Sequence, residues 1–146
     1  MNTPPPSANI APGPVWALLS PIGRLSREPY WLSFAFVLVI IGIPVKIWLA
    51  SLMEFQANEN LTLETLPIND FMASNPLLPI LYLVLNWVHL ALVIKRLQDV
   101  GLSGFLALLI FVPVVSLLLV IILGFVPSQA KPNRSGPLPN SYWRKS

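Results

Sequence analysis

Apolar residues fall into three long runs that short polar stretches separate. The first run carries one charge, Lys46, the second has Asn86 and His89 as its main polar side chains, and the third carries no charge. A helix that crosses a bilayer needs about 20 mostly apolar residues. The pattern predicts an all-α integral membrane protein with three membrane-embedded helical segments, at about 30–52, 77–94 and 102–126.

Composition supports the same class. Charged residues make up 10% of the 146 residues, against roughly 25% in soluble domains, while hydrophobic residues reach 55% and the mean hydropathy is +0.70. A soluble chain of this length could not cover so much apolar surface with so few charges. The net charge of +3 is too small to indicate a nucleic-acid partner.

The two ends of the chain read as irregular. Residues 1–19 are rich in proline and carry no charged side chain, which predicts a disordered arm, with 15–19 as a short apolar turn at the membrane surface. Residues 20–139 are expected to form a single membrane domain. The residues after Val126 are rich in proline and basic side chains and predict an extended tail, of which 140–146 lie beyond the domain.

The positions of lysine and arginine predict the orientation. Two spans separate Arg24 and Arg27 from Lys95 and Arg96, so these four side chains should share one face of the membrane. The 54–75 loop is acidic and contains neither lysine nor arginine. The positive-inside rule then makes residues 20–29 and 95–101 cytoplasmic and the 54–75 loop extracytoplasmic.

The third run allows two interpretations. As one helix its 25 residues would extend about 37 Å and would cross the bilayer easily. That crossing exports the basic tail, against the positive-inside rule. A bend at Pro113 would instead make a re-entrant hairpin and return the tail to the cytoplasm. Length favours the single crossing, which is the first expectation, and a short distance between Arg134 and Asp99 would favour the hairpin.

Polar side chains at the predicted cytoplasmic interface form the first candidate site. Asp99 is a short acid among basic residues, so we expect it to pair with Arg24, Arg27 or Arg96. The set either clamps the turns together or holds lipid headgroups or a partner protein. Its members, with Lys95 beside them, are Arg24, Arg27, Glu28, Arg96, Asp99, Asn133 and Arg134.

A second candidate lies within the second run. Tyr82, Asn86 and His89 share one face of a helix. Polar side chains inside a membrane usually hydrogen-bond to a neighbouring helix, and that is the first interpretation. The alternative is a position on a proton or ion pathway.

The sequence contains few residues that could form a catalytic or metal-binding site. The chain has no cysteine and a single histidine, and no nucleophile, phosphate-binding or paired-carboxylate motif is present. We therefore expect neither an enzyme nor a bound metal or cofactor.

Three motifs carry a resemblance. They are Gly23-Arg24-Leu25-Ser26-Arg27-Glu28-Pro29-Tyr30-Trp31, Lys95-Arg96-Leu97-Gln98-Asp99-Val100-Gly101-Leu102-Ser103-Gly104-Phe105 and Pro132-Asn133-Arg134-Ser135-Gly136-Pro137. Together they resemble the YhaH-like family of bacterial inner-membrane proteins, domain of unknown function 805. This chain departs from the family pattern at Lys95, at Gln98 where histidine is usual, and at Phe105 where tryptophan is usual. The resemblance implies a location in a bacterial inner membrane. It implies no particular activity, because none is established for the family.

These observations together predict a small multi-pass accessory or interaction protein without enzymatic activity. Its expected partners are membrane lipids, with anionic headgroups among them, another copy of the chain, or a second membrane protein. The alternative is a subunit of an oligomeric transporter or channel for a small solute or ion. In that case Asn86 and His89 would face the pathway, and an oligomer is required because three spans cannot enclose a channel alone.

Overall fold

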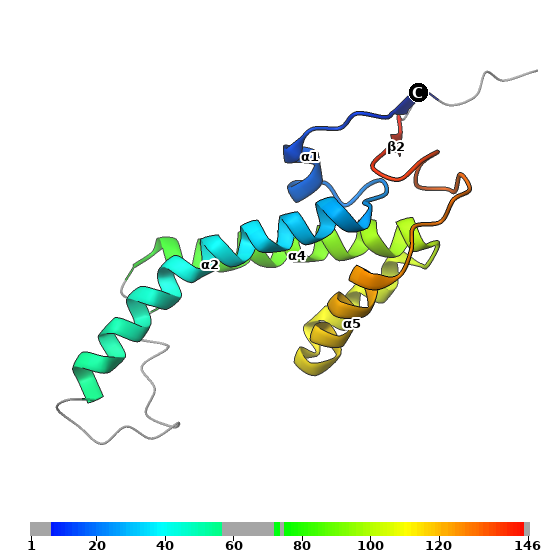
Figure 1. Cartoon of the computed structure of the whole chain (residues 1–146). Helices are drawn as coiled ribbons and strands as arrows, with labels where there is room; N and C mark the ends of the chain where they lie inside the picture. Colours follow the sequence, from blue (N-terminus) through cyan, green and yellow to red (C-terminus); the bar gives the residue numbers. More distant parts are fainter. Residues whose placement is uncertain (1–6, 57–71, 74, 145–146) are drawn as a thin grey trace, which may run out of the picture. The chain divides into compact units, whose positions relative to one another are not determined.

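The computed structural model describes residues 7–56, 72–73 and 75–144, and most of these are helical (Figure 1). The elements are β1 (Ala8–Asn9), α1 (Pro14–Leu19), α2 (Arg27–Gln56), α4 (Leu77–Val100), η2 (Gly104–Phe111), α5 (Pro113–Phe125) and β2 (Tyr142–Trp143). In the described part, two helices, α2 and α4, are long and apolar enough to cross a membrane, and α5 is a shorter apolar helix. Most of the predicted 54–75 loop lies outside the described residues, and its first residues, 54–56, belong to α2.

The chain divides into two compact units. One contains the residues up to Phe34 and those from Trp87 onward, and the other is Ala35–Asn86. Helices α2 and α4 each contribute residues to both units. Every candidate interfacial residue belongs to the first unit, which is the one described below.

Helix α2 begins where the sequence changes from polar to apolar. The Ser26 carbonyl accepts the first helical hydrogen bond, from the Tyr30 amide at 3.2 Å, and Glu28 lies in the first turn, where the helix dipole favours an acid. The helix is longer than the predicted 30–52 and continues through Pro44. Large apolar side chains such as Leu38 and Ile43 are mostly exposed.

Helix α4 also continues beyond its predicted end. The second segment is predicted to end at residue 94, but Lys95 to Val100 form further turns of the helix. The turn proper is at Gly101, whose φ of +85° favours glycine. The amide of Gly101 donates to the Gln98 carbonyl and that of Leu102 to the Leu97 carbonyl, the Schellman pattern that ends many helices.

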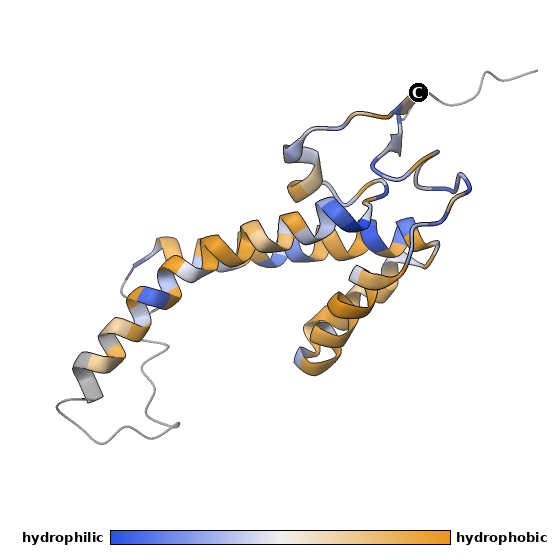
Figure 2. Cartoon of the chain, in the orientation of Figure 1, coloured by the Kyte–Doolittle hydropathy of each residue, from blue (hydrophilic) through white to orange (hydrophobic). Residues whose placement is uncertain are grey.

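The third apolar run is not one helix. It consists of the 3-10 helix η2 and the α-helix α5, which pack against each other, and the chain reverses between them (Figure 1). Val112 is extended because the residue before a proline is kept out of the helical region, and Pro113 then starts α5. The expected single straight helix is therefore wrong, and the bend at Pro113 is the form that the structure adopts. Both segments are apolar throughout their length (Figure 2).

The two ends of the chain meet. Strand β1 pairs antiparallel with β2, with Ala8 opposite Trp143 and Asn9 opposite Tyr142. The ring of Trp16 in α1 stacks on that of Tyr142 at 5.7 Å. Within 7–19 the structure has a short strand, β1, and a short helix, α1, so this part of the expected disordered arm is ordered. The apolar turn predicted at 15–19 lies in α1, and residues 1–6 are outside the described residues. The arm carries too few apolar residues to order alone, but the tail supplies a partner for it.

Candidate functional site

A buried cluster of three charged side chains lies where α2 begins and α4 ends. Arg24 Nε is 3.1 Å from Asp99 Oδ1, and Arg96 Nη1 donates to Asp99 Oδ2, one turn away on α4. All three side chains are fully buried. The expected pairing of Asp99 with an interfacial arginine is confirmed, and each carboxylate oxygen serves a different arginine.

Arg24 uses its remaining donors on the tail. Its Nη1 donates to the carbonyl of Lys131 at 3.0 Å and more weakly to that of Gly136 at 3.4 Å, while Nη2 donates to the carbonyl of Gln129. The amide of Gln129 in turn donates to the Asp99 carbonyl at 2.9 Å. Arg24, which precedes α2, therefore anchors the tail that follows α5.

Arg96 binds the end of α5 in the same way. Its Nε donates to the Leu123 carbonyl at 2.8 Å and its Nη2 to the Val126 carbonyl. Leu123 lies in the last turn of α5 and Val126 is its C-cap residue, and carbonyls at this end of a helix lack an internal partner. A buried guanidinium thus takes the place of water at the end of this helix.

Lys95 performs a related task for α1, which the sequence did not reveal. Its Nζ donates to the carbonyls of Trp16, at 2.8 Å, and Ala17, and it lies 4.6 Å from the centre of the Trp16 ring. Trp87 adds a hydrogen bond from its indole to the Leu19 carbonyl at 2.8 Å. Two side chains of α4 therefore complete the C-terminal end of α1.

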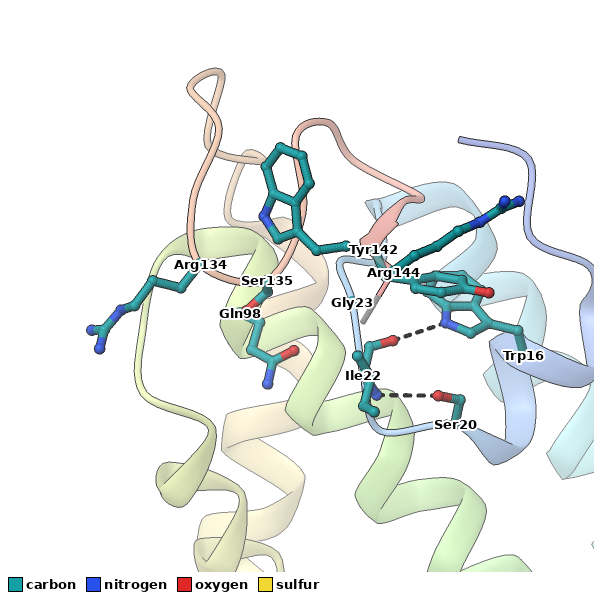
Figure 3. A pocket seen from close by; sticks show the side chains of 10 residues that line it. Trp16, Ser20, Ile22, Gly23, Gln98, Arg134, Ser135, Tyr142 and Arg144 are labelled. Carbon is teal, nitrogen blue, oxygen red and sulfur yellow. Dashed lines mark hydrogen bonds between the residues drawn. The ribbon is translucent and has the colours of Figure 1, made fainter. Parts of the chain in front are cut away.

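The tail motif contacts the end of α4 next to the cluster through its asparagine. Asn133 Nδ2 donates to the Gln98 carbonyl at 2.8 Å and to Gln129 Oε1 at 3.1 Å. Arg134, the next residue, is exposed, and its side chain points away from Gln98 (Figure 3). The hairpin thus brings Asn133 beside the end of α4, whereas Arg134, which a bend at Pro113 was expected to bring beside Asp99, forms no ion pair with it.

Two further residues of the tail tie it to α2 and were missed. Asn140 and Ser26 exchange two hydrogen bonds, from the Ser26 amide to Asn140 Oδ1 at 2.8 Å and from Asn140 Nδ2 to Ser26 Oγ at 2.9 Å. The Ser141 carbonyl accepts from the Arg24 amide at 2.9 Å. Residues 140–146 were expected to lie beyond the domain, and no local pattern in the sequence marks these contacts.

We call residues 7–30, the end of α4 (95–100) and the tail from 127 to 144 the polar cap. The candidate residues occupy two layers of it. Arg24, Arg96 and Asp99 are buried, whereas Arg27, Glu28 and Arg134 are exposed and form no ion pair with any residue that the structure describes.

The second candidate site takes a different form from the one expected. Asn86 Nδ2 donates to the Tyr82 carbonyl of its own helix at 2.8 Å, and Tyr82 itself is mostly exposed. The His89 ring contacts the Phe34 ring of α2 edge-on at 5.4 Å, and its buried Nε2 has no hydrogen-bond partner among the described residues. In the described part, the expected hydrogen bond between helices is therefore not made by either side chain.

A cavity of about 500 Å³ opens on the polar cap (Figure 3). Trp16 and Tyr142 line one part of it, Gln98 and Ser135 another, and the Trp16 indole is held by a 2.8 Å hydrogen bond to the Ile22 carbonyl. The described residues contain no group of three acidic, histidine or cysteine side chains that could hold a metal ion.

Comparison with known proteins gives one result. A family model described as "protein of unknown function (DUF805)" matches residues 18–137, which include all three motifs. No curated protein and no solved structure matches the chain.

Proposed function

The chain belongs to the DUF805 family, whose function is unknown, and from its geometry we propose a non-enzymatic accessory protein of the bacterial inner membrane. In this proposal α2 and α4 cross the bilayer and carry the polar cap on the cytoplasmic side. The cap presents a cationic surface to anionic headgroups or to a partner protein. The observation that carries the proposal is the two-layered cap, with a buried ion-pair cluster beneath exposed basic side chains.

The exposed charges of the cap are nearly all positive. Four basic side chains, Arg27, Lys131, Arg134 and Arg144, are exposed, against one exposed acid, Glu28, among the described residues of this unit. The buried side chains of Arg24, Arg96 and Asp99 are hydrogen-bonded to one another and to backbone carbonyls, so none of them is presented on the outer surface. An excess of exposed arginine and lysine next to a membrane attracts anionic lipid, at about 1 kcal/mol per basic residue.

The hairpin supports a cytoplasmic tail. Because η2 and α5 pack side by side and α5 ends on Arg96, the basic tail starts from the same end of α4 as the basic 95–96 pair. This arrangement removes the conflict with the positive-inside rule. Both backbone groups of Val112 at the bend are paired, since its amide donates to the Leu109 carbonyl at 3.1 Å and its carbonyl accepts from the Ser116 amide at 2.7 Å. A re-entrant segment needs this pairing at membrane depth.

The buried cluster favours a structural role over a catalytic one. A catalytic group has to reach its substrate, whereas Arg24, Arg96 and Asp99 have no exposed surface and are saturated with protein partners. Such a cluster fixes one arrangement of the segments that meet there, and removing one member leaves the others buried without compensation.

The transport alternative has less support. It needs a row of polar side chains that is free to serve a solute, but Asn86 bonds to its own helix and His89 packs on Phe34. Among the described residues, the buried His89 Nε2, which has no hydrogen-bond partner there, is the observation that favours it. An oligomer with His89 on a wet axis would revive this alternative.

The proposal is tested by crosslinking inside cells. A photo-reactive amino acid replaces Arg27 or Arg144 in the cap, or Leu38, an exposed apolar residue of α2, as the matched control. We expect both cap positions to capture one common species, a protein or an anionic phospholipid, that Leu38 does not capture. Adducts that are the same at all three positions would contradict a specific cap surface.

A further inference from the structure

A groove of about 600 Å³ runs from the polar cap onto the apolar hairpin, within the first unit. Its polar end is formed by Gln98, Arg134 and Ser135, and its apolar part by Ile94 of α4 and Leu108 of η2, among others. The volume is within the usual range for a small-molecule site, about 300–1,000 Å³. It is separate from the buried cluster, none of whose three residues lines it.

The polar end has unused binding capacity of two kinds. Arg134 is exposed, and no hydrogen bond or ion pair joins it to the described residues. A guanidinium offers a fork of donors that matches the oxygens of a phosphate. Gln98 Oε1 is buried without a hydrogen-bond partner in the described part of the chain, and a buried acceptor in that state calls for a donor. A phosphate next to a hydroxyl group would satisfy both.

The apolar part continues into a surface that suits hydrocarbon. Phe105 is 83% exposed and Leu108 59%. Exposed apolar side chains of this size mark an interaction surface, and in an embedded hairpin they contact acyl chains. A free phosphate would use the polar end and leave the apolar part unused. An amphiphile uses both, because its chain leaves the groove directly into the bilayer.

We propose that this groove binds one anionic glycerophospholipid. The headgroup phosphate lies against Arg134, a headgroup hydroxyl donates to Gln98 Oε1, and an acyl chain follows Ile94 and Leu108. Phosphatidylglycerol has this combination of phosphate and free hydroxyl. The inference rests on the proposed function, because it requires the cap to lie at the membrane surface, and it replaces a general cationic surface with a defined site.

The test measures lipid bound to the purified full-length protein by native mass spectrometry in a neutral detergent. Phosphatidylglycerol is titrated against phosphatidylcholine of the same chain length. We expect phosphatidylglycerol to bind at least tenfold more tightly and Arg134→Gln to reduce that binding about fivefold, the effect of one basic contact near a membrane. Arg144→Gln is the matched control, since this exposed arginine of the same tail does not line the groove. It should leave the affinity within twofold of the wild type.

Three results would overturn the proposal. Equal binding of the two lipids would remove the headgroup preference. Equal losses in Arg134→Gln and Arg144→Gln would indicate a general charge effect. Full displacement of the lipid by glycerol 3-phosphate at matched concentration would indicate a site for a free anion. Each of these results can occur while the cap crosslinks as proposed, so failure of the groove and failure of the proposed function are separable.

Discussion

At the scale of single residues, Asp99 organises the cap because it is a single acid shared by two buried arginines. Its two carboxylate oxygens bind Arg24 and Arg96 separately, and each arginine extends the connection to backbone carbonyls of the hairpin or the tail. Charge-assisted hydrogen bonds of this kind are stronger than neutral ones, but burial of the charges offsets most of the gain. The cluster therefore specifies the arrangement of the segments more than it adds net stability.

Replacing Asp99 tests this role. Asp99→Asn leaves two guanidinium groups buried without a counter-charge, so we expect it to lower the free energy of unfolding by about 3–5 kcal/mol. Glu28→Gln is the control, because Glu28 is exposed and should change stability by less than about 0.5 kcal/mol. Both are measured by denaturant titration in detergent micelles. Equal stabilities of the two variants would mean that the cluster is not a structural centre.

Asn140 provides a second test at this scale. It combines the two hydrogen bonds to Ser26 with a positive φ of 60°, which asparagine and glycine tolerate better than other residues. Asn140→Gly keeps the backbone conformation and loses the hydrogen bonds, at a cost of about 1–2 kcal/mol. Asn140→Ala should cost more, since it also strains the backbone. Limited proteolysis of the tail measures the difference between the variants. If neither variant is cleaved faster than the wild type, the contact between Asn140 and Ser26 is refuted.

Part of this network follows from the sequence. The pairing of Asp99 with an arginine was predictable, because two predicted spans bring their interfacial ends to one face. The partners of Ser26 and Lys95 were not, since they lie 114 and 79 residues away and depend on how the ends of the chain pack. The charge of Lys95 suggested an exposed turn, but the free carbonyls of α1 provide a partner that allows it to be buried.

At the scale of elements, α5 depends on close contact with the start of α2. Gly124 lies against the Trp31 indole, whose Nε1 donates to the Gly124 carbonyl at 3.2 Å, and Tyr30 Oη donates to the Val120 carbonyl at 3.2 Å. A methyl group on Gly124 would overlap the Trp31 ring. The hairpin is therefore held by a matched small and large pair as well as by Arg96.

This contact gives a prediction with an internal control. Gly124→Ala should lower the free energy of unfolding by about 1–3 kcal/mol, because the added carbon overpacks the Trp31 contact. Gly42→Ala makes the same change in α2, where a new Cβ would meet no atom within 4 Å. It should be neutral or stabilising by up to about 1 kcal/mol. Thermal unfolding in detergent compares the two, and a similar loss in both would rule out the packing explanation.

The presence of the helices could be predicted from the apolar runs, while their ends could not. The length of the third run favoured one helix, and the charge of the tail favoured a hairpin. Neither property reveals the backbone hydrogen bonds of Val112 or the contact of α5 with Trp31. Those contacts form only in the folded chain. The same reason explains α4, whose last turns carry charges that appear interfacial in the sequence and are buried by the tail.

At the scale of the whole molecule, we propose that both ends of the chain belong to one cytoplasmic cap. The N-terminal strand pairs with the C-terminal strand, and the arginine cluster ties the tail to α2 and α4. A third crossing would separate these partners by the thickness of the bilayer, about 30 Å of hydrocarbon. The position of the tail relative to the membrane therefore decides the claim.

Single-cysteine labelling measures that position directly, since the chain has no cysteine of its own. Ala11→Cys and Ala130→Cys report on the two ends, both exposed, and Glu59→Cys reports on the acidic loop, which lies outside the described residues. With a membrane-impermeant maleimide, we predict labelling of Glu59→Cys in intact cells and of the other two only after the membrane is opened. Labelling of Ala130→Cys in intact cells, with Ala11→Cys protected, would contradict the shared cap.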